Sequence, residues 1–156
     1  MSAYLKKHWT SILKWVSFFQ IISFSIGYFT KGGDLPWYQL LVKPQLTPPP
    51  ILFPIIWGFF YTVLGYFAFL IMEQRVKHSV KALFWFHMVA NWVWSFLFFK
   101  LNLTFLAFLD IVFLIGSLGG FIFYVQKMSR LAPLLYFYLA WLVFAAYLSF
   151  EIWRLN

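Results

Sequence analysis

Residues 43–57 read KPQLTPPPILFPIIW, and this stretch joins a polar loop to a long apolar segment. Proline fixes the backbone angle φ and has no amide hydrogen, so Pro48, Pro49 and Pro50 suit a stiff loop and the first turn of a helix. Pro54 follows one turn later. A helix that starts near Pro50 would lose only its first backbone hydrogen bond there, so the cost of this proline is small. The stretch therefore predicts a loop that gives way to a helix near Pro50.

The composition indicates a membrane protein. Of the 156 residues, 63% are hydrophobic and 10% are charged, and the chain holds 22 Phe, 9 Trp and 9 Tyr. A soluble domain of this size could not bury so much apolar surface, whereas lipid solvates it directly. Cysteine is absent, which excludes disulfides and thiolate chemistry. The net charge is +8, and the basic residues that produce it lie at the ends of apolar runs. Membrane lipid is therefore an expected partner, and nucleic acid is not.

Five apolar segments are each long enough to cross a hydrocarbon core, which needs roughly 20 helical residues. The expected helices cover residues 9–29, 50–72, 82–99, 103–126 and 131–153, and residues 30–49 form a long loop. The predicted fold is an all-α membrane protein, a compact bundle of five transmembrane helices in a single domain over residues 1–156.

An odd number of crossings places the two termini on opposite sides of the membrane. One side then carries Lys6, Lys7, Lys14, Arg75, Lys77, Lys81, Lys127 and Arg130, and the other carries Lys31, Lys43, Lys100 and Arg154. By the positive-inside rule, the N-terminus is expected in the cytoplasm. No targeting segment is recognisable, which favours a bacterial inner membrane.

Polar residues inside the apolar runs are the first candidates for chemistry. Asp110 is the acidic residue that lies well inside a span, and an ionisable group at membrane depth suggests function; a hydrogen-bonded tie between helices is the equal alternative. His87, Asn91 and Ser95 recur at steps of four, so they share one face of the third helix. They either bond to neighbouring helices or supply the polar contacts of a pocket. No second histidine lies at ligand spacing, so no metal site is predicted.

Aromatic residues within the spans give the main signal of function. They form faces on three helices, with Trp57 and Tyr61 on the second, Trp94 on the third, and Tyr138, Trp141, Ala145 and Ser149 on the fifth. Trp57 and Trp141 lie away from the interfacial belts where tryptophan concentrates. A flat, largely apolar ligand could stack on them, and plain packing is the alternative.

A pair of glycines marks one face of the fourth helix. Gly116 and Gly120 form a GxxxG pattern, which lets another helix approach closely. This pattern predicts a homodimer through the fourth helix.

Several short motifs occur in order over nearly the whole chain. They are WY at 37–38, KPxxTPP at 43–49, Trp57, NxxWSxxFF at 91–99 and YxxWxxFAxxLS at 138–149. Together with five spans and a long first loop, they resemble the tryptophan-rich sensory protein and translocator protein (TspO/MBR) family, once called peripheral-type benzodiazepine receptors.

The resemblance implies a five-helix bundle, commonly dimeric, whose central pocket binds porphyrins and synthetic isoquinoline or benzodiazepine ligands under a lid formed by residues 30–49. Carried over by position, the pocket residues are Tyr38, Pro48, Trp57, Asn91, Trp141 and Ala145. The residue patterns add Tyr61, Trp94, Asp110 and Ser149 as candidate ligand-binding residues. The expected ligand is a porphyrin or another hydrophobic small molecule, and no cofactor is expected.

The main hypothesis is a membrane receptor or sensor that binds porphyrins. Some bacterial members of the family are implicated in light-dependent protoporphyrin degradation, so the alternative is an enzyme in which Trp57 and Trp141 are catalytic. Transport of lipid or porphyrin, or regulation of a partner protein, is a further alternative. Leu46 stands where the family often has tryptophan, so one aromatic wall of the lid is absent. Phe150 and Arg154 stand where eukaryotic members carry a Tyr–Arg cholesterol pattern, which argues against cholesterol transport.

Overall fold

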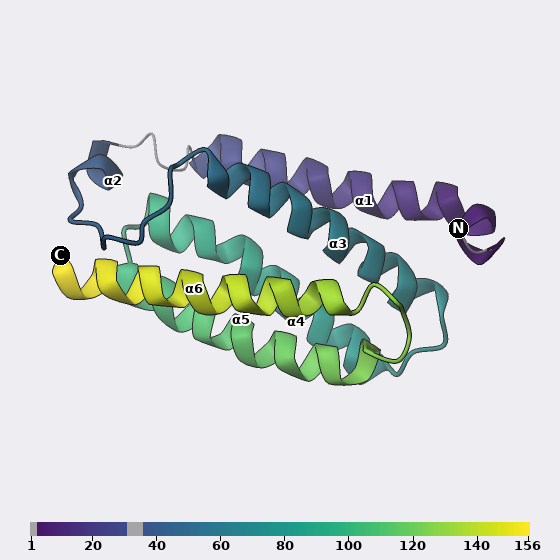
Figure 1. The fold of residues 1–156 in the computed structure, drawn as a ribbon. Coiled ribbons are helices and arrows are strands. Elements are labelled where there is room, and N and C mark those ends of the chain that lie inside the picture. The colour runs from purple at the N-terminus through teal and green to yellow at the C-terminus, as the bar shows by residue number, and fades with distance from the viewer. Residues whose placement is uncertain (1–2, 31–35) are drawn as a thin grey trace.

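Long helices make up most of the structure, a computed structural model that describes residues 3–30 and 36–156 (Figure 1). The long helices are α1 (Ala3–Thr30), α3 (Leu52–Glu73), α4 (His78–Ser95), α5 (Thr104–Val125) and α6 (Pro133–Leu155). A short helix, α2 (Pro36–Leu40), precedes α3, and a π-helical segment, η2 (Phe96–Lys100), continues α4. The described residues contain no strand.

Five helices are long and apolar enough to cross a membrane. They span His8–Thr30, Leu52–Glu73, His78–Lys100, Thr104–Val125 and Pro133–Leu155. The predicted all-α fold with five membrane-spanning helices is confirmed. The N-terminus and the C-terminus lie at opposite ends of the bundle, and α2 lies at the same end as the C-terminus (Figure 1).

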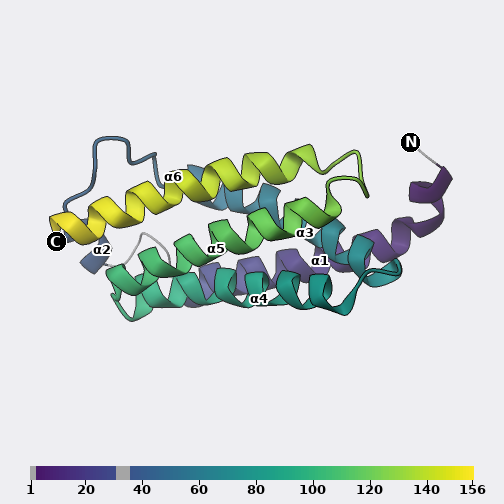
Figure 2. The same cartoon turned by 90° about the horizontal axis from the view of Figure 1, so that it is seen from below.

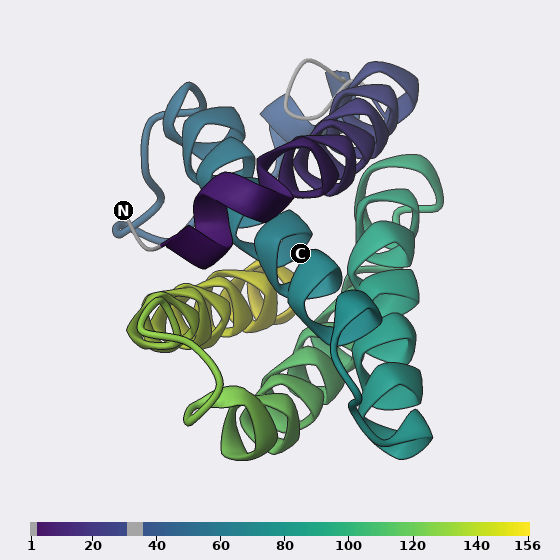
Figure 3. The same cartoon turned by 90° about the vertical axis from the view of Figure 1, so that its right-hand side faces the viewer.

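The helices form two groups. The backbones of α1 and α3 run close together (Figure 1), and those of α4, α5 and α6 lie side by side in chain order (Figure 2). By contrast, α3 approaches the backbones of α4 and α6 at few points. Viewed along the bundle, α1 lies on one side and α5 and α6 on the other, and α3 runs from the side of α1 toward the middle (Figure 3). Large side chains must therefore fill the space between α3 and α6.

Close packing of α1 on α3 depends on a glycine. A Cβ atom at Gly65 would lie 2.8 Å from Val16 Cα and 3.2 Å from the Trp15 carbonyl oxygen. The same pair of helices is joined by Gln20, whose Nε2 donates to the Gly58 carbonyl oxygen at 2.7 Å. Because the contact at Gly65 is to backbone, a larger residue there would push the two helices apart.

The proline junction opens α3 two residues later than predicted. The amide of Leu52 donates to the Pro49 carbonyl at 3.0 Å, and the amide of Phe53 donates to the Pro50 carbonyl at 3.3 Å. These short-range bonds make a turn that leads into the helix at Leu52. Pro54 is the third helical residue, where an amide has no intrahelical partner in any case, so its missing donor costs no bond.

Other boundaries also differ from the sequence-based expectation: α1 begins at Ala3 and not at residue 9, and α6 covers Pro133–Leu155 and not 131–153. The helix α4 begins at His78, four residues before the apolar run, because polar residues can occupy a first turn at the membrane surface. The predicted loop 30–49 contains the helix α2, which opens with a proline. Residues 31–35 of that loop lie outside the described residues, as does Lys31 of the predicted charge distribution, and the side chains of Lys6 and Lys7 are not described either.

Candidate functional site

A small cavity lies among α3, α4, α5 and α6. Its volume is about 20 Å³, which is room for about one water molecule. Its wall consists of apolar and aromatic side chains: Phe53, Trp57, Trp94, Ile111, Leu114, Trp141, Leu142 and Ala145. The cavity therefore lies on the seam between the two helix groups.

Helical spacing and ring contacts place the aromatic wall. Phe53 and Trp57 are one turn apart on α3, as are Trp141 and Ala145 on α6. The ring of Phe53 meets that of Trp141 edge-to-face with centroids 5.9 Å apart, and Trp57 meets Tyr138 in the same way at 6.3 Å. Edge-to-face contact is a favoured geometry for aromatic pairs, so these rings join α3 to α6.

The structure brings part of the predicted ligand-binding set to the cavity. Trp57, Trp94, Trp141 and Ala145 line it. The other predicted residues do not, and these are Tyr38, Pro48, Tyr61, Asn91, Asp110 and Ser149. The unpredicted wall residues are Phe53, Ile111, Leu114 and Leu142. The aliphatic residues among these carry no distinct signal in an apolar run, although Phe53 could have been found from its place one turn before Trp57.

Asn91 belongs to a buried hydrogen-bonded network below the cavity. Its Oδ1 accepts from the Tyr61 hydroxyl at 2.7 Å, and its Nδ2 donates to the Tyr138 hydroxyl oxygen at 2.8 Å. Tyr61, Asn91 and Tyr138 come from α3, α4 and α6, and all three are buried. Since both ends of the amide are engaged, Asn91 ties these helices together.

His87 extends the network to α5, and its contacts determine the direction in which each hydrogen bond is donated. The Ser117 hydroxyl donates to the Leu114 carbonyl at 3.1 Å, so its oxygen accepts from His87 Nδ1 at 2.9 Å. Nε2 of the neutral ring is then an acceptor for the Tyr138 hydroxyl, 3.2 Å away. Every donor from Tyr61 to Ser117 thus points the same way along the chain of bonds. The described residues contain no group of three His, Cys, Asp or Glu that could hold a metal ion.

A second set of buried polar atoms has no such partners. Trp94 Nε1, Trp141 Nε1, Asp110 Oδ2 and Ser149 Oγ make no hydrogen bond within the described part of the chain. A fifth such atom, Trp92 Nε1, belongs to a ring that is not part of the cavity wall and that contacts Phe19 of α1. The polar atoms on the cavity side of the bundle are therefore divided between a satisfied network and an unsatisfied set.

Comparison with known proteins identifies the family. The profile of the TspO/MBR family matches residues 15–154. The chain belongs to the TspO/MBR family. It is 34% identical over 137 residues to the tryptophan-rich protein TspO of Archaeoglobus fulgidus, which covers 86% of this chain and 90% of that protein.

Two mammalian relatives show similar agreement with this TspO/MBR chain. The translocator protein of Ovis aries is 34% identical over 134 residues, with coverage of 82% of this chain and 79% of the relative. The translocator protein of Sus scrofa is 36% identical over 131 residues, with coverage of 80% and 78%. Family membership and five apolar helices together make this an integral, multi-pass membrane protein.

The predicted lid of this TspO/MBR protein contacts the bundle through Tyr38. Its ring lies 6.0 Å from that of Phe98 and 5.5 Å from that of Phe99, and Phe98 stacks on Trp94 at 5.4 Å with an interplanar angle of 15°. Burial raises the pKa of the Tyr38 phenol, and Lys43 Nζ lies 4.6 Å from its ring centroid. Tyr38 therefore reaches the cavity wall indirectly, through Phe98 and Trp94.

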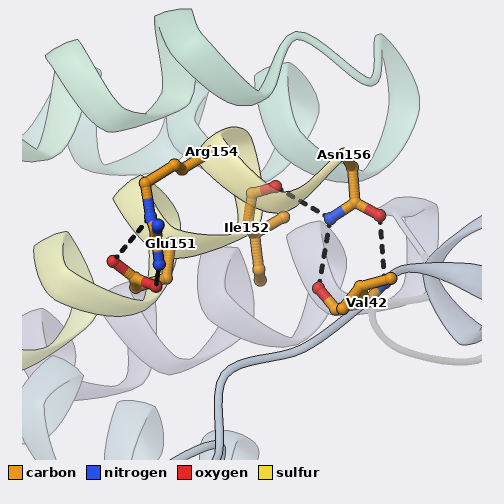
Figure 4. Close-up of polar contacts among 5 residues, drawn as sticks. All are labelled: Val42, Glu151, Ile152, Arg154 and Asn156. Atoms are coloured by element: carbon orange, nitrogen blue, oxygen red, sulfur yellow. Dashed lines mark hydrogen bonds and ion pairs between the residues drawn. The ribbon is translucent and has the colours of Figure 1, made fainter.

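The loop between α2 and α3 is held at its start by the end of α6. The Asn156 side chain accepts from the Val42 amide at 2.9 Å and donates to the Val42 carbonyl at 3.1 Å (Figure 4). Its Nδ2 also donates to the Ile152 carbonyl at 2.8 Å. Further along the loop, Leu46 is 64% exposed and Pro48 is half-buried. Neither Leu46 nor Pro48 is among the residues that line the cavity.

Proposed function

We propose that this TspO/MBR family protein binds porphyrins and related flat hydrophobic ligands between α3, α4, α5 and α6, as a receptor or sensor. The supporting observation is that three helices each contribute a tryptophan, Trp57, Trp94 or Trp141, to the wall of one cavity. Indole rings offer large, rigid, mostly apolar faces on which a flat ligand can stack. Pockets for such ligands are lined mainly by aromatic and apolar side chains.

Ligand binding requires the cavity to open. A volume of about 20 Å³ is far below the roughly 300–1,000 Å³ of pockets for drug-sized ligands. The seam between α3 and the group of α4, α5 and α6 is the place where backbones are least closely packed. Hydrogen bonds across it include Tyr61 to Asn91 and Tyr66 to Ser129, at 2.7 and 3.0 Å. We infer that the ligand enters as α1 and α3 move away from the other helices.

The proposal is tested by titrating the purified protein in detergent with protoporphyrin in the dark. Tryptophan quenching and the shift of the porphyrin absorbance band are both recorded. A Trp57→Phe/Trp141→Phe variant is expected to lose most of the saturable signal in both. The matched control is Trp9→Phe/Trp153→Phe, which removes two exposed tryptophans and should bind like the wild type. Absence of a saturable signal from the wild type would refute porphyrin binding.

Illumination of the same samples tests the enzymatic alternative. Porphyrin bands that fade faster with the protein than without it, and only while Trp57 and Trp141 are present, would assign light-dependent degradation. Stable bands in a protein that binds porphyrin would favour the receptor.

We also propose that the N-terminus faces the cytoplasm of a bacterial cell. Support comes from the charge distribution, because the end of the bundle that holds the α3–α4 and α5–α6 connections carries Lys14, Arg75, Lys77, Lys81, Lys127 and Arg130, and the opposite end carries Lys43, Lys100 and Arg154. A fluorescent protein fused to the N-terminus should be bright in cells, and a dark fusion would contradict this orientation.

A further inference from the structure

Of the four unsatisfied polar atoms near the cavity, all but Trp141 Nε1 lie toward its lid end, where α2 and the C-terminus lie. Ser149 follows the wall residue Ala145 by one turn on α6, and Asp110 precedes the wall residue Leu114 by one turn on α5. Residues one turn apart share a helix face, so both side chains continue the faces that line the cavity. Because α5 starts and α6 ends near the lid, both residues lie on the lid side of the wall (Figure 1).

Helix register brings these residues to one level with Trp94. The hydrogen bond between His87 and Ser117 shows that these two residues lie at the same level on α4 and the antiparallel α5. Trp94 comes seven residues after His87, and Asp110 comes seven residues before Ser117, so Trp94 and Asp110 also lie at one level. In the same way, the contact of Phe108 with Phe150, at 5.4 Å between ring centroids, aligns α5 with α6. That alignment places Asp110 level with Ser149, to within one residue.

The three groups differ in what they can bond. The Trp94 indole can only donate, the bare Oδ2 of Asp110 accepts, and the Ser149 hydroxyl can do either. The network of Tyr61, Asn91, His87, Ser117 and Tyr138 shows that this bundle satisfies buried polar groups deeper in the same core. Buried polar atoms without partners are uncommon in proteins, and an ionisable group at membrane depth is a candidate for function. A ligand edge with adjacent donor and acceptor would complement them.

We propose that the lid end of the cavity is a polar subsite for the secondary amide, or lactam, edge of a flat ligand. The ligand N–H donates to Asp110, its carbonyl oxygen accepts from Trp94 Nε1, and Ser149 bonds to either group. The apolar remainder of the ligand stacks on Trp57 and Trp141. This inference rests on the proposed function, because it requires that the cavity opens for a flat ligand.

Three tricyclic probes of nearly the same shape test the subsite. Phenanthridinone carries the N–H and the carbonyl, N-methylphenanthridinone keeps only the carbonyl, and phenanthrene has neither. Binding to the purified protein is measured by quenching of tryptophan fluorescence, with empty detergent micelles as the blank. The wild type should bind phenanthridinone about tenfold more tightly than its N-methyl form, because the N-methyl form leaves the buried Oδ2 of Asp110 without a hydrogen-bond partner. Equal affinity for these two probes would overturn the proposal.

Two variants assign the contacts separately. Asp110→Leu should remove the preference for phenanthridinone over its N-methyl form, because it removes the acceptor for the ligand N–H. Trp94→Phe keeps a ring but removes the donor, so it should weaken both lactams by about three- to tenfold relative to phenanthrene. The control is Trp92→Phe, which removes an indole N–H that lies outside the cavity wall and should leave the relative affinities of the three probes unchanged.

The outcomes separate this inference from the proposed function. Failure of protoporphyrin and of all three probes to bind would refute the cavity as a ligand site. Binding of protoporphyrin and phenanthrene, without preference for the N–H, would leave the proposed function standing and assign the free polar atoms to water alone. If Asp110→Leu does not fold, the comparison of probes on the wild type and on Trp94→Phe decides the question.

Discussion

Tyr138→Phe removes one oxygen atom from the centre of the buried network. That oxygen accepts from Asn91 Nδ2 at 2.8 Å and donates to His87 Nε2, 3.2 Å away. The ring contacts of Tyr138 with Phe60 and Trp57, at 4.9 and 6.3 Å, remain in the variant. The change in stability therefore measures the loss of the two hydrogen bonds, including the cost of leaving Asn91 Nδ2 and His87 Nε2 without this partner.

The expected magnitude follows from the membrane setting. A hydrogen bond between transmembrane helices stabilises by about 0.6 kcal/mol on average and about 1.7 kcal/mol at most, because the unfolded chain also finds partners within the bilayer. Two such bonds predict a loss of about 1–3 kcal/mol in the free energy of unfolding for Tyr138→Phe. The same substitution at Tyr136 removes one exposed bond to Gln126 Oε1, of 3.2 Å, and should cost less than about 0.5 kcal/mol.

Equilibrium unfolding in mixed micelles, followed by circular dichroism, measures both variants. A double-mutant cycle with Asn91→Leu adds a second test: the joint loss should be smaller than the sum of the single losses, because the two residues share a bond. Equal losses for Tyr138→Phe and Tyr136→Phe would refute the idea that the network stabilises the bundle.

Three further substitutions probe features outside the network. Gly65→Ala should destabilise the fold by about 1–3 kcal/mol through the backbone of α1, whereas Gly27→Ala, with open space around its Cβ, should be neutral in the same unfolding assay. Asn156→Ala should release the loop after α2, seen as faster hydrogen exchange at the Val42 amide. For the predicted homodimer, Gly116→Leu should favour the monomer in analytical ultracentrifugation, because its Cβ faces open space. Gly120→Leu should instead disturb packing on Leu83 of α4, 3.3 Å from its Cβ, and lower stability.

The sequence predicts the spans well because lipid imposes a simple requirement on them. A run of about 20 apolar residues must form a helix, since no other backbone structure satisfies its own hydrogen bonds there, apart from a closed barrel. Start and end residues are less predictable, as at His78, because polar residues can enter the first turn. The five residues of α2 are too few to show a helical period.

The candidate site is only partly predictable, because it depends on contacts between helices. Trp57 and Trp141 are found from their place inside a span, and Ala145 from its small size on the same face. The pairing of Asn91 with Tyr138 depends on helix register, which the pattern of a single helix does not contain. The role of Ser117 also depends on helix register, because no sequence pattern distinguishes this residue and only the structure shows it bonded to His87. The cavity volume depends on side chains from four helices and has no local signal at all.

The π-helical segment η2 at the end of α4 depends on the number of residues in its turn. In η2 the Leu101 amide donates to the Phe96 carbonyl at 3.0 Å, five residues back, so the turn holds more residues than an α-helical turn. Phe98 lies in this wider turn and stacks on Trp94. Loss of one residue between Phe96 and Phe99 would allow the segment to close as α-helix, with either Leu97 or Phe98 lost from the apolar cluster that holds Trp94 and Tyr38. Among natural variants of this protein, single-residue deletions should therefore be rarer in η2 than exchanges of one aromatic residue for another.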